Sequence, residues 1–205
     1  SADAALFYPW IRIRHPSTGQ EIRVPPSGLV SGVIARVAAA RGLHRSAGNE
    51  PIGVASGLER RLSRAQQEML NQAGVSVLRD VPGRGILVWG GRTLSSDPQW
   101  KYLNVRRYVA FLEQSIGRGI DWAVFEPNDE PLWAQIRQSV DDFLSAQWRG
   151  GALLGSKPDQ AWFVCCDRTT MTHTDLRAGR LVVVVGVALT RPAEFVQLRI
   201  VRRMA

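Results

Sequence analysis

The clearest pattern of hydrophobic and polar positions lies in the middle of the chain, between Arg92 and Trp148. Apolar residues there recur at steps of three and four, the spacing of one face of an α-helix: Val105, Tyr108, Val109, Leu112 and Ile116. Gly117 then signals the end of this helix. A second helical face runs up to Gly150, with Leu132, Ile136, Val140, Phe143 and Leu144 on its buried side. Two long helices are predicted, and we expect Leu112 and Ile136 to share one core.

Between these helices lies the short apolar run IDWAVF, residues 120–125. An unbroken run of this length with aromatic members predicts a strand that is covered on both faces. The segment EPNDEP then turns the chain. Asn128 or Asp129 suits the cap of the second helix, while Glu130 and Pro131 suit its first turn. The predicted order is helix, strand, helix.

The residues before this block alternate between strand and helix patterns. LFYPWIRIRHP predicts one strand that ends at Pro16, and STGQEIRVPPSG predicts a loop. A helix follows and ends at Gly42, with Val30, Val33, Ile34 and Val37 on one face. Residues 42–57, rich in Gly, Ser and Pro, predict an exposed connection.

Two further elements precede the central block. Ser63 suits the cap of a short helix that runs through Glu68 and Leu70. VSVLRDV and GILVWG are rich in β-forming residues and are joined by the turn-forming PGRG, which predicts a β-hairpin.

The last third of the chain is rich in strand patterns. GALLGSKPDQ predicts a loop, AWFVCCDR a strand, and TTMTHTDLRAG a polar turn. The valine-rich LVVVVGVALT predicts an inner strand of a sheet. From Glu194 to Arg203, apolar Val196, Leu198 and Ile200 alternate with polar residues, which predicts a final strand. Together these elements predict an α+β fold with a mixed β-sheet flanked by at least three helices.

The composition limits which class of protein this chain can belong to. A chain of 205 residues with 45% apolar content can bury a sizeable core. No apolar run approaches the roughly 20 residues that a membrane-spanning helix needs, so we expect no membrane insertion. The formal net charge of +8 comes almost entirely from arginine. The central block is acidic and the C-terminal end is basic, an asymmetry that can steer copies of the chain together.

Candidate chemistry is sparse. His15, His44 and His173 have no HxxxH or HExxH companion. Cys165 and Cys166 are adjacent in an apolar strand, which disfavours both a disulfide between them and a reactive thiolate. The GRG segments are turns without a phosphate-binding motif, and the acids of EPNDEP suit a helix start. We therefore expect no catalytic residue, no cofactor and no metal site, and not an enzyme.

Several segments nevertheless resemble a known family. RTLSSDPQWKYLNVRRYVAFLEQSI followed by WAVFEPNDEPLWAQIR is similar to the tail sheath protein of contractile phage tails and phage-tail-like particles. ALFYPWI, VPPSGLVSGVIARV, PGRGILVWGGRTL and AGRLVVVVGVALTRPAEFVQLRI resemble further sheath segments in the same order. The resemblance covers roughly nine-tenths of the chain, and a match of that length is more specific than any short motif.

The resemblance implies a structural role. Sheath subunits polymerise helically around an inner tube, attach to baseplate and terminator proteins, and contract to drive the tube through a target envelope. It implies a location in a virion tail or phage-tail-like particle, after assembly in the bacterial cytoplasm. It also leads us to expect that an N-terminal arm of a sheath subunit is missing from this chain.

The resemblance also divides the chain and suggests contact residues. It implies a sheath core domain over residues 1–192 and a C-terminal arm over residues 193–205 that pairs with neighbouring subunits. The residues expected to carry this pairing are Phe195, Val196, Leu198, Ile200 and Arg202. Arg177 and Arg180 are the residues expected to face the tube, through charge contacts that loosen with salt.

One alternative from another class remains open, a basic nucleic-acid-binding domain. Aromatic and basic residues interleave between Trp100 and Tyr108, namely Lys101, Tyr102, Arg106 and Arg107. Tyr108, however, belongs to the predicted buried helix face, and the chain has no known nucleic-acid motif. No nucleic-acid partner is therefore expected, and DNA binding that weakens steeply with salt would separate the two hypotheses.

Overall fold

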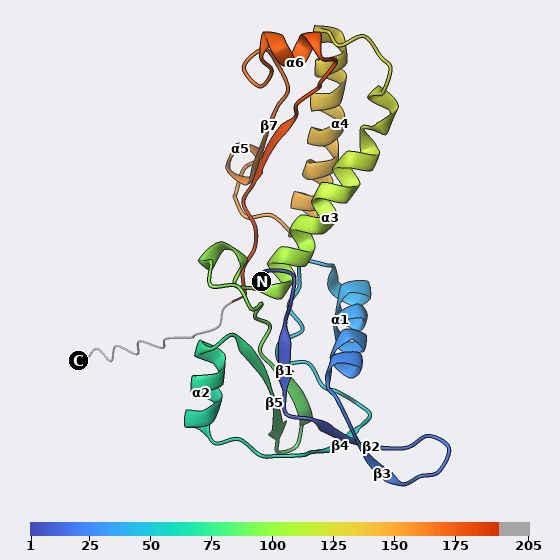
Figure 1. Ribbon diagram of the computed structural model, residues 1–205, viewed down its shortest axis with the longest axis vertical. Helices are drawn as coiled ribbons and strands as arrows, with labels where there is room; N and C mark the ends of the chain where they lie inside the picture. The colour runs from blue at the N-terminus through green and yellow to red at the C-terminus, as the bar shows by residue number, and fades with distance from the viewer. Residues whose placement is uncertain (193–205) are drawn as a thin grey trace, which may run out of the picture.

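The computed structural model describes residues 1–192, and these form an elongated molecule with two parts (Figure 1). We call residues 1–94 the sheet unit and residues 95–192 the hairpin unit. The sheet unit holds six of the strands with two helices, and the hairpin unit holds two long helices with a two-stranded ribbon. The predicted α+β class, a mixed sheet flanked by at least three helices, is confirmed.

The first sheet of the sheet unit has the order β1-β5-β6, formed by β1 (Leu6–Tyr8), β5 (Val75–Val81) and β6 (Gly85–Trp89). β1 runs parallel to β5, and β5 runs antiparallel to β6, so the sheet is mixed. The predicted hairpin over residues 75–90 is confirmed. Its turn uses positive backbone φ angles at Gly83 and Gly85, a conformation that glycine adopts without steric cost.

The second sheet has the order β3-β2-β4 and is antiparallel, with β2 (Ile11–Arg14), β3 (Glu21–Val24) and β4 (Ala55–Leu58). The prediction of a single strand over residues 6–16 is wrong, because the chain breaks at Pro9 and Trp10 and its halves enter different sheets. Proline has no backbone N–H to donate to a ladder, which makes such a break favourable. The predicted loop over residues 17–28 contains β3, and the predicted connection over residues 42–57 ends in β4, so both were only partly right.

Helices α1 (Ser27–Arg41) and α2 (Arg64–Gln72) lie on opposite sides of the first sheet (Figure 1). The predicted face of α1 is confirmed, since Val30, Val33 and Val37 are buried and pack with residues of β2, β5 and β6. The cap of α2 is confirmed as well. The Ser63 side chain accepts a hydrogen bond from the Gln66 amide, and the Gln66 side chain accepts one from the Ser63 amide.

In the hairpin unit, a short helix η1 (Pro98–Trp100) leads into α3 (Leu103–Gly119), and α4 (Glu130–Arg149) runs back beside it. Asp129 caps α4, because its Oδ1 accepts a hydrogen bond from the Leu132 amide at 3.1 Å. Leu112, Ile136 and Leu144 belong to one core between these helices and the ribbon, as predicted. This core is separate from the core of the sheet unit.

The predicted strand over residues 120–125 is wrong. α3 continues past Gly117 to Gly119, and the apolar run forms a turn of 3-10 helix, η2 (Asp121–Ala123), followed by a bend. A strand needs a partner, and no strand among residues 1–192 pairs with this run. The order is helix, turn, helix, and Trp122, Val124 and Phe125 of the run are exposed, whereas Ile120 and Ala123 pack against the core.

The ribbon pairs β7 (Trp162–Cys165) antiparallel with β8 (Val184–Val187), after the short helix α5 (Pro158–Ala161). Between the two strands lies α6 (His173–Arg177), where only a polar turn was predicted. The valine-rich segment was predicted as an inner strand, but within the described residues β8 pairs with β7 alone. Only one face of β8 meets the core, through Val185 and Val187.

Candidate functional site

The junction between the two units is a network of polar contacts that we call the clasp, made of Ser1–Ala4, Leu94, Trp100 and Arg106. The terminal amine of Ser1 donates to the Leu94 carbonyl at 3.0 Å, and the Leu94 amide donates to the Ala4 carbonyl at 2.9 Å. The Arg106 guanidinium lies 2.9 Å from the Asp3 carboxylate and 5.5 Å from the centre of the Trp100 ring. The clasp thus ties both ends of the sheet unit to the first turn of α3.

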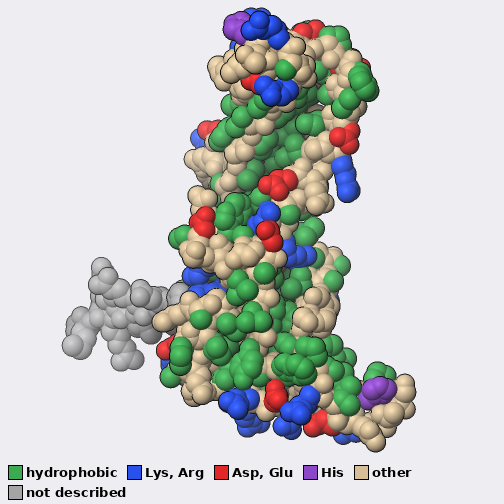
Figure 2. Space-filling model, viewed as in Figure 1, with side chains coloured by type: hydrophobic (Ala, Val, Ile, Leu, Met, Phe, Trp, Pro, Cys, Tyr) green, Lys and Arg blue, Asp and Glu red, His purple; other side chains and the backbone are tan. Residues whose placement is uncertain are grey.

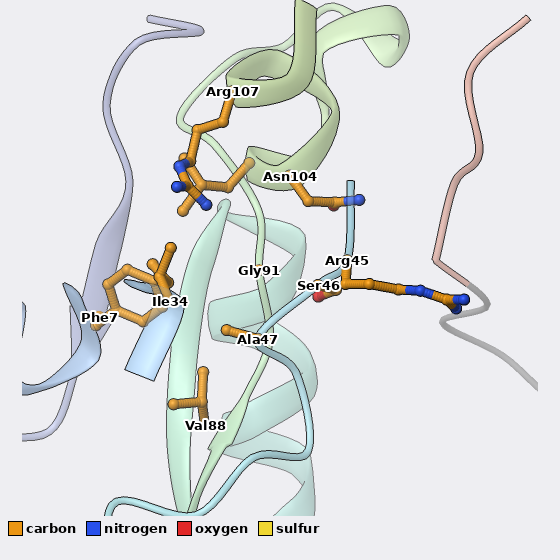
Figure 3. Close-up of a pocket in the computed structure, with 11 residues that line it drawn as sticks. Phe7, Ile34, Arg45, Ser46, Ala47, Val88, Gly91, Asn104 and Arg107 are labelled. Carbon is orange, nitrogen blue, oxygen red and sulfur yellow. The ribbon is translucent and has the colours of Figure 1, made fainter. Parts of the chain in front are cut away.

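Beside the clasp lies a small hollow between α3 and the first sheet (Figure 3). Phe7, Ile34 and Val88 form its apolar wall, and Arg107 points into it from α3. Burial lowers the pKa of Arg107 from its usual value. The cavity volume is about 10 Å³, room for a single water at most. It is too small to hold a cofactor.

A polar pair, buried Asn104 and half-buried His44, lies next to this hollow. The Asn104 side-chain amide donates to the His44 carbonyl at 2.7 Å, and the His44 ring meets the Tyr108 ring edge-on at 6.0 Å. The Tyr108 hydroxyl donates to Gln147 at 3.0 Å, and burial raises the pKa of Tyr108 to about 12. His44 therefore serves the packing between the units.

The end of the hairpin unit far from the sheets carries Arg177 and Arg180. Arg180 binds Asp175 at 2.8 Å, and its carbonyl accepts a hydrogen bond from the Asn128 side chain at 3.2 Å. Hydrogen bonds from Thr172, and then the charge of Arg180, lower the pKa of Asp175. The contact with Asn128 places α6 against the loop between α3 and α4. Both arginines are exposed there.

That loop forms an exposed apolar surface that sequence reasoning missed. We call it the tip, made of Asp121, Trp122, Val124, Phe125 and Glu126. Trp122 is 45% exposed, Val124 61% and Phe125 102%. Figure 2 shows hydrophobic side chains gathered at this loop beside acidic ones. The acids at both ends of the run were the available signal, because a strand buried on both faces seldom carries charges so close.

A second exposed apolar surface covers the side of the ribbon that faces away from α4. We call it the outer face, made of Leu154, Phe163, Val184 and Gly186. Phe163 is 56% exposed, Leu154 52% and Val184 42%. The Phe163 ring lies over Gly186, where an added Cβ atom would come within 2.0 Å of the ring. Gly186 therefore allows the ring to lie flat on the ribbon.

The thiol and carboxylate side chains that the sequence offers for chemistry take part in packing, capping and ion pairing within the fold. Cys166 is fully buried, and burial raises the pKa of its thiol, which disfavours a nucleophilic thiolate. Asp129 caps α4, and Glu130 pairs with Arg168 at 3.0 Å. Residues 1–192 contain no group of three His, Cys, Asp or Glu side chains placed to hold a metal ion.

The interleaved basic and aromatic stretch is used within the molecule. Tyr108 is buried, as predicted, and Arg106 binds Asp3 and Trp100. Lys101 lies over the Tyr102 ring at 5.1 Å. Arg106 and Lys101 thus make contacts inside the molecule, as structural side chains do.

Two further expectations from the sequence are the C-terminal strand and the absence of a membrane-spanning helix. The predicted strand Glu194–Arg203, with Phe195, Val196, Leu198, Ile200 and Arg202, lies outside the described residues. No helix among residues 1–192 is both long and apolar enough to cross a membrane.

The described residues thus present two exposed apolar surfaces, the tip and the outer face. Comparison with known proteins gives the family. The phage tail sheath protein central domain matches residues 1–94, and the phage tail sheath C-terminal domain matches residues 95–203. The chain belongs to the phage tail sheath family. The two family domains meet at the clasp, while the expected boundary at residues 192 and 193 stays a prediction.

Individual relatives agree with this assignment. The tail sheath protein of Burkholderia phage BcepMu is 29% identical over 202 residues, which are 92% of this chain and 40% of the relative. The PVC sheath complex, an extracellular contractile injection system solved in its contracted state, aligns with a TM-score of 0.92 at 33% identity, over 99% of this chain and 57% of that one. The baseplate structure of the anti-feeding prophage aligns with a TM-score of 0.91 at 34% identity, over 100% and 56%. The chain thus spans about half of the length of these relatives.

Proposed function

We propose that this chain is part of a structural subunit of a contractile tail sheath, which polymerises helically around an inner tube and contracts to drive the tube through a target envelope. The observation that carries this proposal is that both sheath domains match in order along the chain. The alignment with the contracted PVC sheath supports it further. The work of contraction comes from subunits that move from a metastable packing to a more stable one.

The proposed partners are other sheath subunits, an inner tube protein, and baseplate and terminator proteins. The match to a baseplate structure supports a place next to the baseplate. The proposed location is a virion tail or phage-tail-like particle, assembled in the bacterial cytoplasm. We propose no enzymatic activity, because the relatives are tail sheath proteins with a structural role.

For the tube contact we propose Arg177 and Arg180, which lie at the end of the molecule far from the sheets. Arg177 has no ion pair within residues 1–192, so its charge is available to a partner, whereas Arg180 shares its charge with Asp175. Reversal of both charges, Arg177→Glu with Arg180→Glu, is expected to reduce tube-templated assembly and its salt sensitivity. Assembly on the tube that is unaffected by the double reversal would assign the contact elsewhere.

For the contact between subunits we propose the strand Glu194–Arg203, which stays a prediction from sequence. Leu198→Pro removes a ladder donor and fixes a backbone angle, so it is expected to prevent sheath formation. Leu198→Val, which keeps the donor and favours a strand, is the matched control. Normal tubes from the proline variant would exclude this strand as the connector.

The experiment that tests the proposed function is electron microscopy of the purified protein in the form that its gene encodes. Helical tubes with the width of a sheath are expected, and their contracted and extended forms are distinguishable by diameter. Particles that stay monomeric at every concentration and salt condition, with or without an inner tube, would contradict the proposal.

A further inference from the structure

We propose that the tip is an interaction surface that docks on the outer face of the ribbon in a second copy of this chain. This inference rests on the proposed function, because it names the partner of one self-assembly contact. It concerns side chains of the two surfaces and is independent of strand pairing by the C-terminal segment. Three properties of the described residues support it.

The first property is the conformation of the tip. Phe125 has a backbone φ of 73°, in the left-handed region that a bulky residue seldom occupies, and its side chain is 102% exposed. Neighbouring Val124 and Trp122 are also largely exposed. Contacts within the chain do not offset the cost of this backbone conformation, because the fully exposed Phe125 ring touches little of its own molecule. An external binding surface accounts for both the strain and the exposure.

The second property is the charge around the tip. Asp121 and Glu126 bracket the apolar side chains, and neither makes an ion pair or side-chain hydrogen bond within residues 1–192. The next two acids along the chain are used internally, since Asp129 caps α4 and Glu130 binds Arg168. The tip therefore presents apolar side chains between two unpaired carboxylates. A complementary surface is apolar and has basic side chains nearby.

The third property is that the outer face has this complementary character. The exposed Phe163 ring and Val184 make it apolar, and the exposed Leu154 lies beside the end of the ribbon, where its amide donates to the Ala188 carbonyl at 2.7 Å. Arg149 and Lys157, which flank Leu154 in sequence, are exposed and make no ion pair within the described residues. The outer face thus matches the tip in polarity, and the two unpaired cations close to Leu154 in sequence match the carboxylates of the tip in charge.

The placement of the two surfaces suits a propagating contact. The ribbon packs on one side of α4, and the loop that carries the tip leaves toward the other side (Figure 1). The two surfaces thus lie on different parts of the hairpin unit and can be occupied at the same time. A contact between unlike surfaces of identical copies gives a ring or an open helix, and a sheath is an open helix.

The sharpest test is Phe125→Gly in the protein as its gene encodes it. Glycine removes the ring and adopts the positive φ without strain, so the melting temperature is expected to stay the same or rise. The critical concentration for tube formation, measured by sedimentation and electron microscopy, is expected to rise at least about tenfold, because a central aromatic residue of an interface is lost. Met69→Ser on α2 is the matched control, because it removes an exposed apolar side chain, 64% exposed, that belongs to neither surface. Its critical concentration is expected to equal that of the wild type.

A charge exchange tests the identity of the partner surface. Asp121→Lys with Glu126→Lys is expected to weaken assembly, and adding Arg149→Glu with Lys157→Glu is expected to restore it, because the ion pairs are remade in the opposite direction. Phe163→Ser on the outer face is expected to weaken assembly as Phe125→Gly does.

The outcomes separate this inference from the proposed function. Wild-type protein that forms no tubes overturns the proposed function, and this inference with it. Wild-type tubes together with equally good tubes from Phe125→Gly overturn this inference alone. A defect at the tip without rescue by the charge exchange, together with normal assembly of Phe163→Ser, shows another partner and also overturns it.

Discussion

The sheet unit and the hairpin unit differ in how they use their surface groups. In the sheet unit, arginines and acids pair with one another at close range, as Arg23 does with Glu59 at 2.8 Å and Arg61 with Asp80 at 3.0 Å. Its exposed apolar residues, such as Val54 and Met69, come from separate elements. In the hairpin unit the exposed apolar residues gather on two surfaces, the tip and the outer face.

This difference teaches where contacts with other molecules are concentrated. Isolated exposed apolar residues are ordinary, whereas grouped ones mark interaction sites. Surface ion pairs add little to stability, so the pairing in the sheet unit says little about its contacts with other molecules. The hairpin unit groups its exposed apolar area on two surfaces, so we expect it to carry more of the assembly energy. Three predictions test how far the two units are independent.

The largest expected effects come from the two cores. Ile136→Ala in the hairpin unit and Leu78→Ala in the sheet unit each remove a side chain that is at most 1% exposed, at a cost of about 2–5 kcal/mol in unfolding free energy. Leu112→Ala is expected to act as Ile136→Ala does, because both residues belong to one core. Denaturant unfolding followed by tryptophan fluorescence measures these costs.

The same unfolding curves show whether the units are separate. If the cores are independent, each substitution shifts its own transition and leaves the other in place. A single transition that shifts equally for both would mean that the clasp couples the units into one cooperative body. Unchanged unfolding for Ile136→Ala and Leu112→Ala would show that the helix faces are wrongly assigned.

Intermediate effects are expected at the helix caps, one in each unit. Asp129→Ala removes the cap of α4, and Ser63→Ala removes half of the capping box of α2, each at a cost of about 1 kcal/mol. Thermal unfolding monitored by circular dichroism measures both. Asp129→Asn is the control, since asparagine caps nearly as well, and a loss as large as that for alanine would mean that the charge rather than the hydrogen bond matters.

The smallest effect is expected at the junction between the units. Burial, and then the charge of Arg45, lowers the pKa of His44 below its usual value near 6.5. The folded state therefore binds this proton less readily than the unfolded state, so stability is intact above about pH 6.5 and falls as the pH drops below it. His44→Phe keeps a ring on Tyr108 and removes this titration. Its unfolding free energy is expected to change less between pH 7.5 and pH 5.5 than that of the wild type, and an identical slope would exclude His44 as the source.

The sequence allowed good predictions where the determinants are local. The faces of α1, α3 and α4 follow from helical periodicity, and the caps at Ser63 and Asp129 follow from side chains within one turn. The β5–β6 hairpin follows from its turn residues.

Features set by distant partners were not predictable in this way. β4 exists because it pairs with β2, which lies about forty residues before it in sequence. β3 pairs with β2 across the short turn of residues 15–20, so it is a local hairpin that the loop-like composition of residues 17–28 concealed. The run at residues 120–125 has the composition of a buried strand, and only the absence of a partner strand beside it makes it a tip. The outer face could not be predicted either, because a valine-rich segment does not reveal which of its faces is covered.

The length of α4 has a mechanical consequence. Its 20 residues span about 30 Å from the sheet unit to the loop at its far end. A rotation of about 10° at the base therefore moves that loop by about 5 Å, nearly the rise of a full helical turn. The helix is a lever that converts a small change of angle into a displacement large enough to exchange one set of neighbours for another.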